Sequence, residues 1–125
     1  MDGAAELRRG LDSGCVAEAE ILRMDGTVRT STAGFLTTVQ EGRRLVGLFE
    51  APADALADGI SVGGERYVAA EASRHLLHGK RGGRGVVAVR RPPFVVVGLY
   101  REGQQSGDAL LAVDQLAALL AAASH

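Results

Sequence analysis

Residues 79–99 read GKRGGRGVVAVRRPPFVVVGL, a valine-rich stretch divided by glycines and prolines. Val86–Arg91 and Phe94–Leu99 are the two runs in it whose composition favours β-strands. Pro92-Pro93 cannot donate to a strand ladder and therefore marks the connection between them. Gly82-Gly83 marks a turn just before the first run. The stretch predicts consecutive antiparallel strands joined by tight turns.

The same pattern continues upstream of this stretch. Three shorter β-type runs occupy Ile60–Val62, Arg66–Ala70 and His75–His78, and Gly63-Gly64 supplies another turn. Glycines separate these short runs, which is typical of consecutive strands joined by turns. We therefore expect an antiparallel meander over residues 60–99.

The N-terminal third predicts a helix followed by a hairpin. Ala4–Leu11 is rich in good helix formers, and Ser13-Gly14 can end that helix. Val16–Arg23 and Thr27–Thr32 then flank an Asp25-Gly26 dipeptide, which suits a tight hairpin turn. This is the clearest local hairpin in the chain.

Two helices are predicted between the hairpin and the meander. Thr38 and Glu41 have the spacing of a capping box, and the helix that they open has an apolar face made of Val39, Gly42, Val46 and Phe49. Pro52 suits the first position of a second, short helix, and Gly59 can end it.

The C-terminal segment Asp108–Ser124 is rich in Ala and Leu and predicts a helix capped by Ser106 or Asp108. Its expected sheet-facing stripe consists of Leu110, Val113, Leu116, Ala117 and Leu120.

Composition narrows the class of protein. The chain has 125 residues and a formal net charge of −1, which argues for one globular domain over residues 1–125 and against a generally basic nucleic-acid binder. Its single cysteine, Cys15, cannot form an internal disulfide, so a reducing compartment is the simpler expectation. No run approaches the ~20 apolar residues that span a bilayer, and we expect no transmembrane segment.

The order of these elements, together with three motifs, resembles the profilin family. The motifs are GISVGGERY (59–67), the basic hairpin GKRGGRGVVAV (79–89), and the closing strand Val95–Tyr100 followed by Ser106-Gly107 and the helix with VDQL (113–116). The resemblance implies an α/β (α+β) fold. In that fold a central antiparallel sheet lies between the terminal helices on one side and the short helices on the other.

The resemblance also implies what such a protein does. Profilins bind monomeric actin and so regulate filament assembly, capture proline-rich segments between the two terminal helices, and contact acidic phosphoinositides. A cytoplasmic, cytoskeleton-associated monomer without a cofactor or catalytic activity is the corresponding expectation. The positions that match the family's actin surface are Arg66, Arg74, Lys80, Arg84, Arg90, Arg101, Gln105, Leu111 and Gln115.

A second set of residues defines an alternative function. Arg74–Arg91 contains six Lys or Arg residues and no Asp or Glu, which permits a local positive patch on a nearly neutral protein. The alternative is a divergent profilin-fold module that binds anionic lipid with little actin affinity; a solvated hairpin is the plainer interpretation. The candidate lipid contacts are Lys80, Arg81, Arg84, Arg90 and Arg91.

Proline-rich ligands are expected to bind poorly. The family's first-helix Trp and Tyr are missing, the chain has no Trp, and Arg29 stands near the position of the second-strand Trp. Proline rings need aromatic faces on which to stack. The Ser31–Phe35 run beside this position resembles the testis-type branch of the family, in which lipid contacts matter more.

Other chemistries have little support. His75 and His78 have no Cys or carboxylate cluster to complete a metal site. The GKRGGRG run lacks the Gly-Lys-Ser/Thr spacing of a phosphate loop, and no spaced catalytic set organises the nucleophiles. A roadblock-type dimer of similar topology is the remaining alternative.

Overall fold

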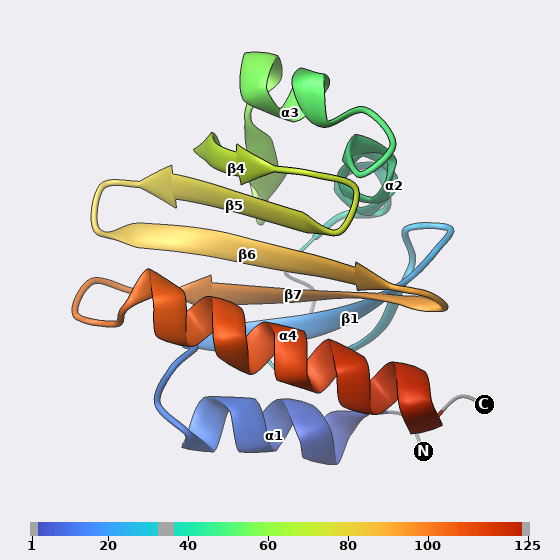
Figure 1. Ribbon diagram of the computed structural model, residues 1–125, viewed down its shortest axis with the longest axis vertical. Helices are drawn as coiled ribbons and strands as arrows, with labels where there is room; N and C mark the ends of the chain where they lie inside the picture. Colours follow the sequence, from blue (N-terminus) through green and yellow to red (C-terminus); the bar gives the residue numbers. More distant parts are fainter. Residues whose placement is uncertain (1–2, 33–36, 124–125) are drawn as a thin grey trace.

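A seven-stranded antiparallel sheet forms the centre of the computed structural model, which describes residues 3–32 and 37–123 (Figure 1). The strand order is β2-β1-β7-β6-β5-β4-β3. The strands are β1 (Glu18–Arg23), β2 (Val28–Ser31), β3 (Ile60–Val62), β4 (Glu65–Ala72), β5 (Leu76–Arg81), β6 (Arg84–Arg91) and β7 (Phe94–Tyr100). The helices are α1 (Ala4–Asp12), α2 (Val39–Leu48), α3 (Pro52–Asp58) and α4 (Ser106–Ala123).

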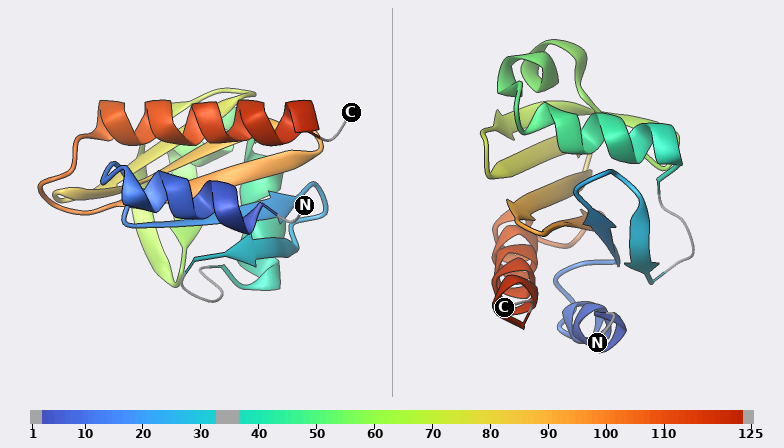
Figure 2. Two further views of the ribbon diagram at one scale, coloured as in Figure 1. Left: turned by 90° about the horizontal axis from the view of Figure 1, so that it is seen from below. Right: turned by 90° about the vertical axis from the view of Figure 1, so that its right-hand side faces the viewer.

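The sheet separates two apolar cores. On one side, α1 and α4 pack with Leu7, Val113 and Leu120 against Ile21 and Val96 of the sheet. On the other side, α2 and α3 bury a second set that consists of Leu45, Leu48, Phe49 and Ala55 with Ile60, Val86 and Val97. The two views of Figure 2 show the terminal helices together on one side and α2 and α3 on the other. The predicted fold class is confirmed.

The meander arises because each connection is a tight turn. Gly63-Gly64 and Gly82-Gly83 separate successive strands, and Pro92-Pro93 joins β6 to β7, as predicted. β6 and β7 are buried over most of their length because both faces carry helices. β4 is interrupted by a register shift between Ala69 and Glu71, so that Glu71 pairs with His78.

The capping box of α2 is present, but one residue of its predicted apolar face is wrong. The Thr38 hydroxyl accepts from the Glu41 N–H at 3.1 Å, and the Glu41 carboxylate accepts from the Thr38 N–H. Val39 is 53% exposed because it occupies the first turn, beyond the edge of the core. The buried positions of this helix are Gly42, Leu45 and Leu48.

α4 departs from its predicted pattern in two ways. Ala109 is buried where Leu110 was expected; Leu110 is half-buried at the edge of the core. By length and composition alone this helix could cross a membrane, contrary to the expectation that no segment qualifies. In the fold its Val113–Ala117–Leu120 stripe is packed on the sheet, as in any core helix. Of the Ser31–Phe35 run, residues 33–35 lie outside the described part of the chain.

Candidate functional site

One side of the sheet is only partly covered by helices. α4 lies along β6 and β7, and β4 and β5 extend past it on the same side (Figure 1). Partners across an antiparallel pair point to one face. Val68 pairs with Lys80, and Glu71 pairs with His78. We call the surface formed by Val68, Leu76, His78 and Lys80 of the sheet and Leu111 of α4 the open face.

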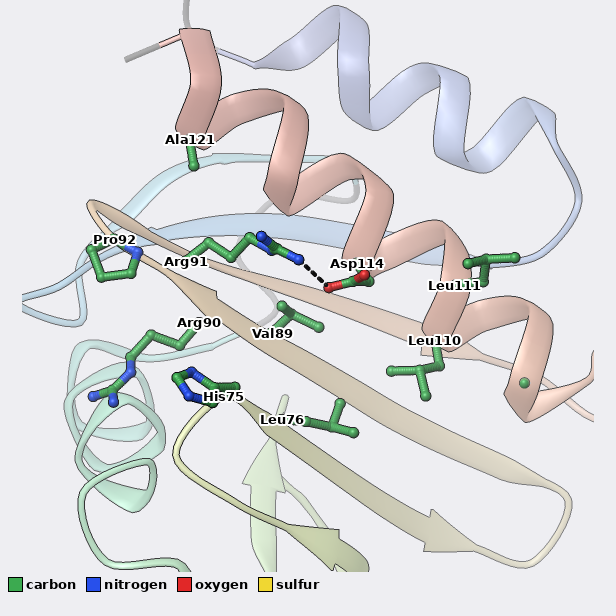
Figure 3. Close-up of a pocket in the computed structure, with 11 residues that line it drawn as sticks. His75, Leu76, Val89, Arg90, Arg91, Pro92, Leu110, Leu111, Asp114 and Ala121 are labelled. Carbon is green, nitrogen blue, oxygen red and sulfur yellow. Dashed lines mark hydrogen bonds and ion pairs between the residues drawn. The ribbon is translucent and has the colours of Figure 1, made fainter. Parts of the chain in front are cut away.

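A groove of about 910 Å³ runs between α4 and the ends of β5 and β6 (Figure 3). We call it the α4 groove. Leu76, Val89 and Leu110 give it apolar walls, and Arg91 and Asp114 form an ion pair across it at 3.2 Å. A hollow of this size and lining suits apolar side chains of a partner, with the ion pair fixing orientation. The remaining lining residues are His75, Arg90, Pro92, Gly107, Leu111 and Ala121.

The open face exposes apolar side chains. Val68 is 74% exposed and Leu111 is 57% exposed. Leu111 was one of the candidates from the sequence, and the structure shows that its side chain is exposed. Val68 was missed because a valine in a strand is ordinarily a core residue. A register assignment is needed to see that it points away from both cores.

His78 is the polar centre of the open face and was also missed as a site residue. Its Nε2 lies 2.7 Å from the hydroxyl oxygen of Tyr100, two strands away. Burial of the imidazole and then the nearby Lys80 ammonium lower the pKa of His78, whereas Glu71 acts in the opposite direction. The neutral ring is therefore favoured. The sequence places these residues 22 apart, and only the sheet brings them together.

The five predicted lipid contacts do not form one patch. Alternation along β5 and β6 places Lys80 and Arg91 on the side of the sheet that carries α4, and the other three on the side of α2 and α3. Arg84 pairs with Glu65 at 3.1 Å, and the Arg81 guanidinium donates to the Arg66 carbonyl oxygen at 3.1 Å. Arg90 lies over the Phe49 ring and pairs with Glu50.

The remaining actin candidates are also dispersed. Arg74 shares Glu50 with Arg90, at 3.6 Å. Arg101 pairs with Glu18 at 3.3 Å. Gln105 is exposed just before α4, and Gln115 faces α1. Of the nine, the structure groups Lys80 and Leu111 on the open face.

A second, narrower groove of about 190 Å³ lies between α1 and α4. We call it the helix–helix groove. Its lining within the described chain contains no aromatic side chain and consists of Glu6, Arg9, Gly10, Ser13, Ala112, Gln115, Leu116 and Leu119. Near the missing second-strand Trp position, the Arg29 guanidinium lies 5.1 Å from the centroid of the Phe94 ring. The groove therefore offers no stack of rings.

Residues 3–32 and 37–123 contain no candidate metal-binding site. No group of three or more His, Cys, Asp or Glu side chains there is placed to hold an ion. His75 precedes β5 at the rim of the α4 groove. His78 forms a hydrogen bond with the Tyr100 hydroxyl group.

Comparisons with known proteins agree with this geometry. The profilin family model matches residues 8–125. Profilin-1B of Acanthamoeba castellanii is 38% identical over 106 residues, which are 84% of this chain and 83% of that protein. The crystal structure of Acanthamoeba castellanii profilin II has a TM-score of 0.90 at 28% identity and covers 97% of this chain and 98% of that chain.

A more distant structure shares the fold. Mouse profilin IIa, in complex with a double repeat from the FH1 domain of mDia1, has a TM-score of 0.80 at 19% identity over 97% of each chain. With the family model spanning most of the sequence and a relative above 30% identity, the chain belongs to the profilin family, the actin-monomer-binding regulators of actin assembly.

Proposed function

We propose that this profilin binds monomeric actin through the open face and the adjoining α4 groove. The observation that carries this assignment is Val68, an exposed valine beside Lys80 on the part of the sheet that α4 leaves uncovered. Apolar residues in the centre of a protein interface supply most of its binding energy, and charged residues around them orient the partner. The protein then acts stoichiometrically, by masking one actin surface, and not by catalysis.

The α4 groove extends this surface. Leu111 lies at its edge and Leu76 in its wall, so an apolar side chain of actin could enter beside them. Asp114 holds Arg91 within the groove, which leaves Lys80 as the cation of the open face available to an acidic partner. The family assignment sets aside the roadblock-type dimer.

Substitution on opposite faces of the sheet tests the proposal. Val68→Glu should weaken binding to labelled monomeric actin at least about tenfold, because it places a charge at the centre of the interface. Arg84→Glu is the matched control on the α2–α3 side and should change affinity less than about twofold. The measurement is equilibrium anisotropy with folded variants. Unchanged binding by Val68→Glu, or a larger loss from Arg84→Glu, would place the actin surface elsewhere.

Proline-rich and lipid partners receive less support. Mouse profilin IIa forms its complex with an FH1 repeat, but the helix–helix groove of this chain lacks aromatic side chains among its described residues. We therefore expect weak binding of plain polyproline. A phosphoinositide surface would have to draw basic residues from both faces of the sheet, which disfavours multivalent contact with one headgroup.

The expected location, cytoplasmic and associated with the cytoskeleton, follows from actin binding.

A further inference from the structure

His78 and Tyr100 form a fixed polar pair on the open face. The two ring centroids lie 5.8 Å apart with an angle of 51° between the ring planes, and His78 Nε2 lies 2.7 Å from the tyrosine hydroxyl oxygen. Tyr100 is buried, whereas His78 is half-buried and retains a surface that a partner can cover. The tyrosine therefore holds the imidazole at a defined place on the open face.

Two charged groups act on this imidazole. Glu71 of β4 is its partner across the strands, and Lys80 follows it by two residues on the same face of β5. β6 presents the uncharged Val87 opposite it. Burial and then Lys80 lower the pKa of His78, and Glu71 raises it by less. The cluster thus contains one permanent cation, one carboxylate and one group that titrates.

Charged groups on the other neighbouring elements have different environments. Asp114 of α4 is paired with Arg91 in the α4 groove, and Asp108 is exposed in the first turn of that helix. Glu102 follows β7 and packs close to Gly83. His75 precedes β5 at the rim of the α4 groove. The charge of the open face near its polar centre is therefore set by His78 together with Lys80 and Glu71.

Protonation changes the charge of the His78–Tyr100 pair without requiring its separation. A neutral imidazole with its hydrogen on Nδ1 accepts from the tyrosine hydroxyl group, whereas an imidazolium donates its Nε2–H to the hydroxyl oxygen. Burial raises the pKa of Tyr100, so the hydroxyl group keeps its proton over the same range. The protonated pair places a second positive charge near Lys80.

We propose that His78 is a contact residue of the actin-binding surface and docks there in its neutral form, so that acidification weakens actin binding. This inference rests on the function proposed above for the open face. His78 and Lys80 are two residues apart on one strand, or ~7 Å, so a partner that covers Lys80 also covers the imidazole. Removal of water costs an imidazolium more than a neutral ring, and a single carboxylate, Glu71, would face two cations.

The pH dependence of actin affinity tests this inference. Equilibrium anisotropy with labelled monomeric actin, blocked against polymerisation, is measured from about pH 7.5 to about pH 5.5. Affinity should be flat above about pH 7 and fall at least about twofold toward pH 5.5, by no more than about tenfold per pH unit because one proton is excluded. The fall belongs below the ordinary histidine pKa of 6.5, since the pKa of His78 is lowered.

Two variants identify the proton, because the titrating groups of actin are common to all measurements. His78→Gln keeps a hydrogen-bonding group near Tyr100 and cannot be protonated, so its affinity should lose the acid-dependent fall seen in the wild type. His75→Gln is the matched control three residues away and should keep the wild-type profile. Both variants are compared with the wild type as folded full-length chains.

The outcomes separate this inference from the actin assignment. Identical profiles for the wild type and His78→Gln, a wild-type affinity that rises on acidification relative to His78→Gln, or loss of the dependence in His75→Gln would each overturn it. Val68→Glu at pH 7.5, where His78 is neutral, tests the assignment itself. Weaker binding by Val68→Glu with a flat wild-type pH profile would retain the actin surface and reject the role of His78, whereas unchanged binding by Val68→Glu would reject both.

Discussion

Gly85 makes room for the ring of Tyr100. A Cβ atom at residue 85 would overlap the tyrosine ring, so the glycine lets the ring cross β6 and lets its hydroxyl group reach His78 on β5. This small residue thereby joins three strands through one polar contact. The contact lies on the open face, where burial and the nearby Lys80 ammonium lower the pKa of His78 and favour the neutral imidazole.

The lowered pKa of His78 predicts a pH dependence of stability. The unfolded histidine titrates near pH 6.5, and the folded one titrates lower. Between the two values the unfolded chain binds more protons, so stability rises with pH and falls on acidification. His78→Gln should therefore lose less stability than the wild type between about pH 7 and about pH 5.

Urea unfolding of both proteins at each pH measures this difference, and the other titrating groups are common to both. Glutamine can still hydrogen-bond to the Tyr100 hydroxyl, so the comparison isolates the proton. Parallel pH profiles would show that His78 does not contribute.

At the scale of elements, α2 is joined to the rest of the molecule by Gly42 and Glu41. Gly42 packs against the backbone of Gly26 in the β1–β2 turn, where φ is 88°. Glu41 caps its own helix and also accepts from the N–H groups of Gly63 and Gly64, at 3.2 and 2.9 Å. One helix N-terminus thus connects two turns that are distant in sequence.

Two glycines of α2 should respond to alanine with opposite signs. Gly47 has open space around its Cβ position in the described structure, so Gly47→Ala should stabilise the protein by about 1 kcal/mol through helix propensity. In Gly42→Ala the new methyl would overlap the Gly26 carbonyl, and we expect a loss of about 1–3 kcal/mol. Denaturant midpoints measure both. Stabilisation by both substitutions would contradict the close packing at Gly26.

The role of Glu41 predicts a graded loss. Thr38→Ala removes one capping bond and should cost about 1 kcal/mol. Glu41→Ala removes acceptors for three backbone donors and should cost about 1 kcal/mol more. Gln40→Ala, on the exposed side of the same turn, is the control and should change the free energy of unfolding little. Equal losses for Thr38 and Glu41 would mean that the bonds to the β3–β4 turn contribute nothing.

At the scale of the molecule, the sheet divides the positive charge between two faces. The net charge is −1, so association depends on local charge and not on a global field. Lys80 shares the open face with the proposed apolar contacts, whereas Arg81, Arg84 and Arg90 belong to the opposite side. Of the latter group, Arg84 and Arg90 form ion pairs with Glu65 and Glu50, and Arg81 donates to the Arg66 carbonyl oxygen.

Actin association rates should reflect this division. Lys80→Glu should slow association at low salt, and the difference should fade as salt rises, because exposed charges are screened within about 10 Å at 0.1 M. Arg81→Glu is the control one residue away and on the other face. Stopped-flow mixing with labelled actin measures both rates. A larger effect from Arg81→Glu would contradict the assigned faces.

The sequence by itself determined the secondary structure and the family. Gly-bounded valine runs, the Asp25-Gly26 turn and the Thr38–Glu41 capping box are local signals, because backbone conformation and nearest hydrogen bonds fix them within a few residues. Strand ends were less certain, as the longer β4 and β6 show. Leu111 was identified as a candidate from its match to the family's actin surface, and the structure shows that it is exposed.

Only the tertiary structure decided which side chains share a surface. A strand alternates every residue, so the face of each arginine depends on register, and the shift between Ala69 and Glu71 cannot be foreseen from composition. The His78–Tyr100 contact, the exposure of Val68 and the unpartnered Oε2 of Glu6 likewise arise between elements far apart in the chain. Local sequence specifies the elements, whereas packing between them specifies the sites.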